Sequence, residues 1–389
     1  MNKTVYFLGA GFSADAGGPI QNQIIQFIFE EDFVEKFQHK PRIIEARKQF
    51  ISFVNETLEI EEELRDKIAL EDVFTPIDRA LSQGKSFKKF DIKELADLRE
   101  RFHLLMGAAI QYGVDFQDKD KTYIEDFAKY INSIAKERVD NLYKDQIAII
   151  TTNWDILLDN ALNKLARMFS MAHSESENPK LAVVDYCCYI SSLDKNDKFI
   201  KPGLLALGKN GYNIKYLKLH GSMNWLHCPN CQRMYVKFDE KTMLIDTVKH
   251  CGHCKKNYKI TSNDNAIKLR SNLLLPTFAK DYSNIQIQLI WQNGGIELSE
   301  ASKVVFIGYS LPQADFEIRQ LLSRCIPNHT EVEVVCYPNR NGTTKSETEK
   351  KEERDWYKTF FGKRIKSDES IIFKKVPDYI SQLVSNNNL

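Results

Sequence analysis

The chain has 389 residues, which is enough for two or three domains and a sizeable buried core. Its 54 Lys and Arg residues against 53 Asp and Glu residues leave a formal net charge of +1, which excludes a globally basic nucleic-acid-binding protein. No apolar run approaches the roughly 20 residues that cross a membrane, and no signal-peptide pattern is visible, so we expect a cytoplasmic protein with no membrane partner.

Strands and helices alternate along the predicted chain. A short buried strand at 3–9 precedes a long, mostly helical segment with amphipathic helices expected at 20–38, 42–58, 59–82, 93–112 and 122–139. Further strands are expected at 146–152, 181–190, 212–219, 303–308 and 331–337, the last closing the sheet. Helices are expected at 155–170, 314–325 and 376–388, whereas the charged segment 339–356 should be a solvated loop. This alternation predicts an α/β protein whose parallel sheet has helices on both faces.

The same pattern predicts four parts of unequal size. Residues 1–20 and 141–340 would form the core, and 21–140 a helical insertion. A small zinc-binding module would occupy 222–262 within the core, and 341–389 would be a charged loop and a helix. In such sheets ligands bind beyond the carboxyl ends of the strands, so the residues directly after each strand are the candidates for function.

The first strand runs into a glycine-rich turn. Gly9-Ala10-Gly11-Phe12-Ser13-Ala14 is a GxGxxA sequence between a strand and a helix, the context in which glycines let the backbone approach a pyrophosphate. Ser13 can donate to a phosphate oxygen. A dehydrogenase would carry an acidic residue at the end of a second strand about 20 residues later, but Glu30, Glu31 and Asp32 fall within a helical pattern. The turn therefore fits NAD binding in a topology other than that of dehydrogenases, although a generic strand–helix turn is the alternative.

Four of the eight cysteines form two CxxC pairs, at Cys228/Cys231 and Cys251/Cys254. In a reducing compartment this pattern indicates a four-cysteine zinc site, and four thiolates fill the coordination shell, so the metal should be structural. Adjacent histidines are alternative ligands: His227, His250 and His253. The other cysteines are expected to be reduced and buried: Cys187, Cys188, Cys325 and Cys336.

Polar residues follow three further strands. Asn153 and Asp155 stand in TTNWD after 146–150, and His220 follows 212–219. Gly308 and Ser310 follow the strand at 303–308 and would add a second flexible phosphate or ribose contact. Taken alone, a histidine such as His220 is more often structural than catalytic.

Together these motifs resemble the sirtuin (Sir2) family, and they occur in the family's order. GAGFSADAGGP is similar to the family's glycine loop, TTNWD to its TQNxD motif, and LHGS with the following CPNC to its catalytic histidine and zinc module. IGYS is similar to its GTS turn, and YPNR places Asn339 at an adenosine contact. The resemblance implies a Rossmann-like core that binds NAD+ and a structural Zn²⁺.

The departures from the family indicate a different activity from protein deacylation. Pro19 is followed by Ile-Gln-Asn where deacylating sirtuins carry Asp-Phe-Arg, and SNLLLPTFAKD stands in place of an FGE-type acyl-lysine motif. These features resemble divergent bacterial anti-phage proteins whose SIR2 domain is an NADase that depletes NAD+. A chain of this size resembles the component that pairs with a HerA-type ATPase, which implies an oligomer and that partner by analogy.

The resemblance also assigns roles in cleavage of the nicotinamide–ribose bond. Asn153 would hold water or ribose hydroxyls, Asp155 the nicotinamide carboxamide, and His220 would be the general base. The dinucleotide would be held by Gly9, Ala10, Gly11, Ser13, Gly308, Ser310 and Asn339.

Two alternatives to an NAD+ hydrolase remain open. One is an NAD-dependent protein deacylase. The other is a non-catalytic nucleotide-binding or nucleic-acid-associated subunit of an ATPase complex. The net charge of +1 favours contact with nucleic acid only indirectly, through a partner. Four lysines near the zinc module either form a basic edge for nucleic acid or are a solvated face: Lys249, Lys255, Lys256 and Lys259. Glu71 and Asp72, at the start of a predicted helix, either line the pocket or form a solvated first turn.

Overall fold

The computed structural model describes residues 2–194, 197, 200, 203–238, 249–262, 266–340 and 342–387. Its centre is a seven-stranded sheet in the order β13-β10-β9-β1-β2-β5-β3, in which every pairing is parallel. The strands are β1 (Thr4–Leu8), β2 (Ile147–Thr151), β3 (Ala182–Asp185), β5 (Tyr212–Lys218), β9 (Lys303–Ile307), β10 (Glu331–Cys336) and β13 (Ile371–Phe373). The predicted α/β class with a parallel sheet is confirmed.

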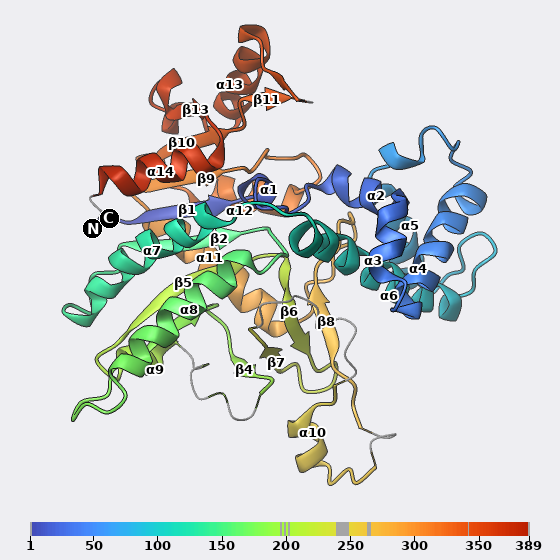
Figure 1. The fold of residues 1–389 in the computed structure, drawn as a ribbon, viewed down its shortest axis with the longest axis horizontal. Coiled ribbons are helices and arrows are strands. Elements are labelled where there is room, and N and C mark those ends of the chain that lie inside the picture. Colours follow the sequence, from blue (N-terminus) through green and yellow to red (C-terminus); the bar gives the residue numbers. More distant parts are fainter. Residues whose placement is uncertain are drawn as a thin grey trace.

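Helices cover both faces of this sheet (Figure 1). One face carries α7 (Thr122–Lys136), α8 (Leu157–Ala172) and α14 (Val376–Asn386), and the other carries α11 (Ile285–Glu300) and α12 (Phe316–Cys325). The strands read as continuous apolar runs because both of their faces are covered, and every residue of β2 is buried. None of the helices in the described part of the chain is long and apolar enough to cross a membrane.

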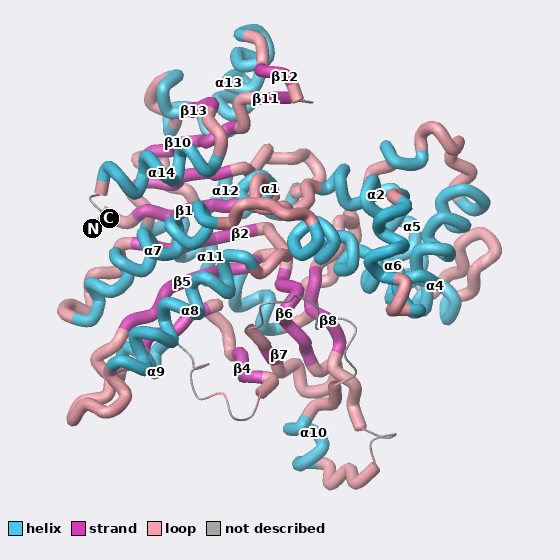
Figure 2. The backbone as a smooth tube through the Cα atoms, viewed as in Figure 1, coloured by secondary structure: helices cyan, strands magenta, loops and turns pink. Residues whose placement is uncertain are grey.

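A second group of helices lies beyond the carboxyl ends of the strands (Figures 1 and 2). It consists of α2 (Gln21–Phe29), α3 (Glu31–Phe37), α4 (Pro41–Ser52), α5 (Leu70–Gln83) and α6 (Ile92–Gln111). These helices have their own hydrophobic cluster, which contains aromatic rings in edge-to-face contact, such as Phe50 against Phe102. By contrast, α7 buries Phe127 and Ile131 in the hydrophobic cluster of the sheet. The predicted insertion at 21–140 thus contains two kinds of helix, one of which packs on the sheet.

The helix predicted at 59–82 is shorter than expected. Glu59 has a left-handed backbone (φ 58°), and α5 begins only at Leu70 after a short 3-10 turn over Arg65–Lys67. The segment between them carries three consecutive glutamates and residues 61–64 are exposed, so it has no apolar face to bury as a helix.

A smaller four-stranded sheet, which the sequence did not predict, adjoins the first. Its order is β4 (Ile190–Ser192), β7 (Met234–Val236), β6 (Gly221–His227) and β8 (Arg270–Leu273). The strand expected at 181–190 is divided between the two sheets, because the chain turns at Cys187 with a φ of 55°. The short helix α10 (Gly252–Asn257) lies at the far end of the smaller sheet, whereas α9 (Gly203–Leu207) packs on β5 and β3 of the larger sheet.

Two expectations for the end of the chain were wrong. The predicted loop at 339–356 contains a hairpin of β11 (Asn339–Arg340) and β12 (Thr343–Thr344), followed by helix α13 (Glu347–Phe361). A capping box starts α13, since Ser346 Oγ accepts from the Glu349 amide while the Glu349 carboxylate accepts from the Ser346 amide. Tyr357 and Phe361, four residues apart, are its buried face. The sheet also does not end at β10, because the apolar residues of β13 pair beyond it.

Candidate active site

One cavity of about 490 Å³ lies at the carboxyl ends of the central strands. The core, the insertion helices and α13 all contribute to its walls. Most of the predicted site residues line it: Ala10, Gly11, Asn153, Asp155, His220, Gly308 and Ser310. Gly9, Ser13 and Asn339 are not part of the lining, although Ser13 is hydrogen-bonded to Asn153, which is. The cavity thus joins residues from opposite ends of the chain, from Ala10 to Tyr357.

Two glycine turns, after β1 and after β9, are packed directly against each other. The Gly11 amide donates to the Gly308 carbonyl (2.9 Å), and a Cβ on Gly9 would lie 2.5 Å from that same oxygen. Gly308 has a φ of +63°, and its own Cβ would lie 2.3 Å from the Phe12 nitrogen. Only glycine fits this contact. The expected helix after the first turn is a single turn, α1 (Gly11–Ala14), and Tyr123 of α7 supports it by donating to the Phe12 carbonyl (2.7 Å).

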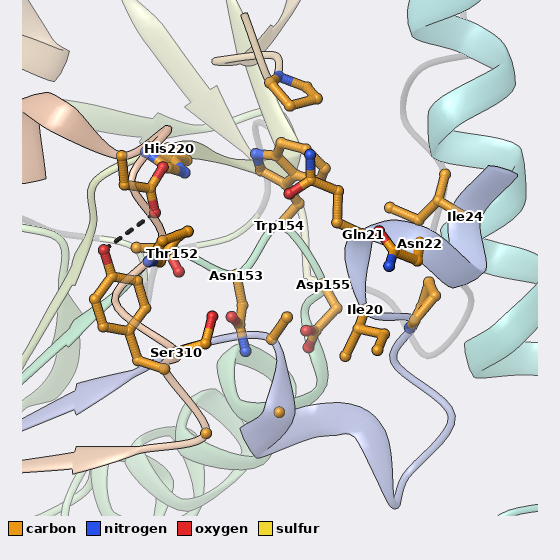
Figure 3. A pocket seen from close by; sticks show the side chains of 18 of the residues that line it. Ile20, Gln21, Asn22, Ile24, Thr152, Asn153, Trp154, Asp155, His220 and Ser310 are labelled. Atoms are coloured by element: carbon orange, nitrogen blue, oxygen red, sulfur yellow. Dashed lines mark hydrogen bonds between the residues drawn. The ribbon is translucent and has the colours of Figure 1, made fainter. Parts of the chain in front are cut away.

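Asn153 and Asp155 extend from the end of β2 toward the glycine turn, and Trp154 extends to the other side (Figure 3). The Thr151 hydroxyl accepts from the Asn153 amide (3.0 Å), and Asn153 Nδ2 donates to Ser13 Oγ (3.2 Å). Asn153 Oδ1 is buried and has no hydrogen-bond partner. Burial raises the pKa of Asp155, although the positive charge of Lys218 opposes this.

A fully buried ion pair lies beneath this loop. Lys218 Nζ donates to Asp159 Oδ2 (2.7 Å) and to the Asp155 backbone carbonyl (2.6 Å), and both ionic side chains are 0% exposed. Tyr186 donates to the other oxygen of Asp159 (2.7 Å). A charge can be buried at an acceptable cost only when it is paired and hydrogen-bonded, and both charges meet this condition. The hydrogen bond from Lys218 also fixes the backbone that carries Asp155.

His220 occupies the turn between β5 and β6. Its carbonyl accepts from the Leu274 amide (2.9 Å), and its Nε2 is buried without a hydrogen-bond partner. Burial lowers the pKa of His220, an effect that Asp315 opposes and Lys280 reinforces. The ring is therefore neutral near pH 7, the form in which a histidine can accept a proton.

Several further residues of this wall belong to none of the sequence motifs. Lys280 lies 3.9 Å from Asp315, whose carboxylate also accepts from the Tyr309 hydroxyl (3.1 Å). Lys345 and Glu353 line the cavity from the part of the chain predicted as a loop. One feature of the sequence could have predicted a helix here. Tyr357 and Phe361 are four residues apart, which is the spacing of a buried helix face.

Of the two acidic residues that begin α5, one lines the cavity and the other does not. Glu71 contributes to the wall and accepts a hydrogen bond from Gln21, whereas Asp72 is exposed to solvent. Both occupy the first helical turn, as predicted.

The four predicted metal ligands form a second cluster, separate from the cavity lining. The sulfurs of Cys228 and Cys254 are 3.7 Å apart, as are those of Cys231 and Cys251, and all four lie within 4.8 Å of one another. Tetrahedral Zn²⁺ with bonds of about 2.3 Å would place its sulfurs about 3.8 Å apart, so the geometry is compatible with zinc. Backbone amides of Cys231 and Cys254 point at the Cys228 and Cys251 sulfurs (3.5 and 3.4 Å), as suits thiolates.

The alternative histidine ligands are not part of the cluster, and the other cysteines are separate free thiols. Cys336 is buried as predicted, whereas Cys187, Cys188 and Cys325 are only partly buried. Burial raises the pKa of Cys187, Cys188 and Cys336, so these thiols stay protonated.

Comparison with family models and with curated proteins finds no match. Among solved structures, the chain is similar to a Sir2 homologue in complex with NAD, at 12% identity over 99% of this chain and 88% of that one, with a TM-score of 0.43. It is also similar to Sir2 with a p53 peptide and NAD+, at 12% identity over 99% and 93%, with a TM-score of 0.40.

Proposed function

We propose that this protein is an NAD+ hydrolase that converts NAD+ and water into nicotinamide, ADP-ribose and a proton. The observation that carries the proposal is the pair of unpartnered buried atoms, Asn153 Oδ1 and His220 Nε2, in one cavity beside the paired glycine turns. Buried polar atoms without partners are rare in folded proteins and mark places where a ligand or water completes the bonding.

The order of the strands suits an extended dinucleotide. The two glycine turns follow the adjacent strands β1 and β9, Asn153 and His220 follow β2 and β5 on one side, and β10 lies on the other. From β5 to β10 is four strand spacings, or about 19 Å. A pyrophosphate at the glycine turns would therefore leave room for one nucleoside on each side.

The reaction breaks the bond between ribose C1′ and the nicotinamide nitrogen, and the electron pair leaves with nicotinamide. Because this leaving group departs neutral, the site needs no strong acid, but it must orient water and stabilise a cationic sugar. Asn153 Oδ1 would hold the water or a ribose hydroxyl, and neutral His220 would take the proton as the water oxygen bonds to C1′. The Asp155 carboxyl would bind the carboxamide.

The surroundings of His220 favour hydrolysis over deacylation of proteins. Leu274, Leu275 and Pro276 line the cavity next to His220, in the segment that lacks an acyl-lysine motif. Gln21 and Glu71 of the insertion add a further wall. By resemblance we extend the proposal to an anti-phage effector that depletes NAD+, acts in the cytoplasm as a homo-oligomer and pairs with a HerA-type ATPase.

The test is release of nicotinamide and ADP-ribose from NAD+ by the purified protein, measured by chromatography with and without the ATPase from the same source. His220→Ala and Asn153→Ala should each reduce the rate by at least about 100-fold, the range for a general base. His329→Ala removes an exposed histidine and should leave the rate unchanged. Absence of nicotinamide release under all conditions, or faster deacylation of an acyl-lysine peptide, would contradict the proposal.

A further inference from the structure

The cavity contains an ion pair that lies on the opposite side of the glycine turns from His220. Lys345 Nζ donates to Glu353 Oε2 (2.6 Å), and both residues line the cavity. Their side chains are only 11% and 26% exposed, so they are not a solvated surface pair. Lys345 follows the β11–β12 hairpin and Glu353 lies on α13, in the part of the chain whose structure the sequence failed to predict.

Lys345 and Glu353 lie near the carboxyl end of β10. Cys336 is the last residue of this strand, and the negative charge of Glu353 contributes, after burial, to the raised pKa of its thiol. β10 pairs with β9 on the side away from β1, β2 and β5. If the reacting end of the dinucleotide lies at His220 and its pyrophosphate at the glycine turns, the second nucleoside reaches Lys345 and Glu353.

Helix α13 holds this pair rigidly relative to the glycine turn. Tyr357 donates to the Tyr309 carbonyl (2.8 Å), and Trp356 Nε1 donates to the Ser310 carbonyl (3.3 Å). These bonds join α13 to the two residues that follow Gly308. A side chain on a fixed helix discriminates between ligands better than one on a mobile loop, because it cannot move away from an unfavourable group.

We infer that Glu353 selects a dinucleotide whose adenosine ribose has a free 2′-hydroxyl, so that the substrate is NAD+ and not NADP+. The inference rests on the proposed function for the identity of the dinucleotide. A carboxylate accepts a hydrogen bond from a ribose hydroxyl, as acidic residues do in other NAD sites, but it repels a phosphate of nearly two negative charges. Lys345 already donates to Glu353, so its ammonium is not available to bind that phosphate.

The experiment measures binding, so it does not depend on hydrolysis. Calorimetry would compare ADP-ribose with 2′-phospho-ADP-ribose on the full-length protein. The wild type should prefer ADP-ribose by at least about tenfold, because like charges brought together in a partly buried site are unfavourable. Glu353→Gln releases Lys345 and should reduce this preference by about tenfold or reverse it. Lys345→Met leaves the carboxylate in place and should retain the preference or increase it.

Glu352→Gln is the matched control, since Glu352 is the exposed neighbour on the same helix, and it should leave the ratio unchanged. Thermal unfolding of each variant shows whether it is folded. Equal binding of the two ligands by the wild type, or an unchanged ratio in folded Glu353→Gln, would overturn the inference. Selective binding without hydrolysis would support the inference while contradicting the hydrolase proposal, and no binding of either ligand would overturn both.

Discussion

Gly308 and Gly11 lie in two turns that form the floor of the cavity, and their backbones are in direct contact. A Cβ atom added to Gly308 would force the two turns apart. A Cβ on Gly308 would be 2.3 Å from the Gly11 carbonyl carbon, and the Gly308 backbone is left-handed. Two independent conditions therefore require glycine at this position. The carboxyl ends of β1 and β9 are joined by a backbone contact in which no side chain takes part.

Replacement of Gly308 by alanine should destabilise the protein and abolish nucleotide binding. Strain from a left-handed alanine contributes about 1 kcal/mol, and displacement of the Gly11 backbone adds about 1–3 kcal/mol. Gly84→Ala is the matched control, because Gly84 has nearly the same φ (+64°) and nothing within 4 Å of its Cβ. Chemical denaturation should show a clearly larger loss of unfolding free energy for Gly308→Ala. Equal losses in the two variants would mean that the contact between the turns contributes nothing.

The pH dependence of NAD+ hydrolysis should reflect the burial of His220. Because burial lowers the pKa of the ring, the neutral form persists below pH 6.5, the value of a free histidine, and kcat/KM should fall only at more acidic pH. Asp155, whose pKa is raised by burial, is a second group that protonates as the pH falls. The profile of Asp155→Asn isolates the contribution of His220. Loss of activity at or above pH 6.5 in this variant would contradict a buried neutral base.

The sequence predicts those parts of the fold that depend on residues adjacent in the chain, and it does not predict those that depend on long-range contacts. The glycine turn, the TTNWD segment and the CxxC pairs are local patterns whose chemistry is readable from adjacent residues, and the structure brings the first two to one cavity. The strands were recognisable because their apolar runs are buried on both faces. Pairing of β6 with β8 is different, because the partners are about 45 residues apart and only tertiary packing selects them.

The C-terminal wall was missed for a related reason. The segment 339–356 is dominated by charged residues, and the two aromatic residues that anchor α13, Tyr357 and Phe361, lie just beyond it. Tyr357 is buried in the core and donates to the Tyr309 carbonyl, 48 positions earlier. The composition of the segment therefore indicated solvent exposure, whereas a few long-range contacts determine its structure.

The four-cysteine cluster should bind one Zn²⁺ per chain and act only as a structural site. Cys228→Ser should reduce the metal content measured by elemental analysis to near zero and unfold the module locally, because metal binding supplies the folding energy of such small sites. Cys325→Ser, which changes a free cysteine outside the cluster, should retain the metal. Full metal content after substitution of Cys228 would show that it is not a ligand.

The buried pair of Lys218 and Asp159 should be needed for both stability and the position of Asp155. Asp159→Asn leaves the Lys218 ammonium without its counter-ion at 0% exposure, and we expect a loss of about 3–5 kcal/mol of unfolding free energy. The double variant Lys218→Met/Asp159→Leu removes both charges and should recover most of that loss. It also removes the hydrogen bond to the Asp155 carbonyl, so KM for NAD+ should rise even though the fold is restored. If the double variant regained wild-type stability and wild-type KM together, the pair would have no role in positioning the loop.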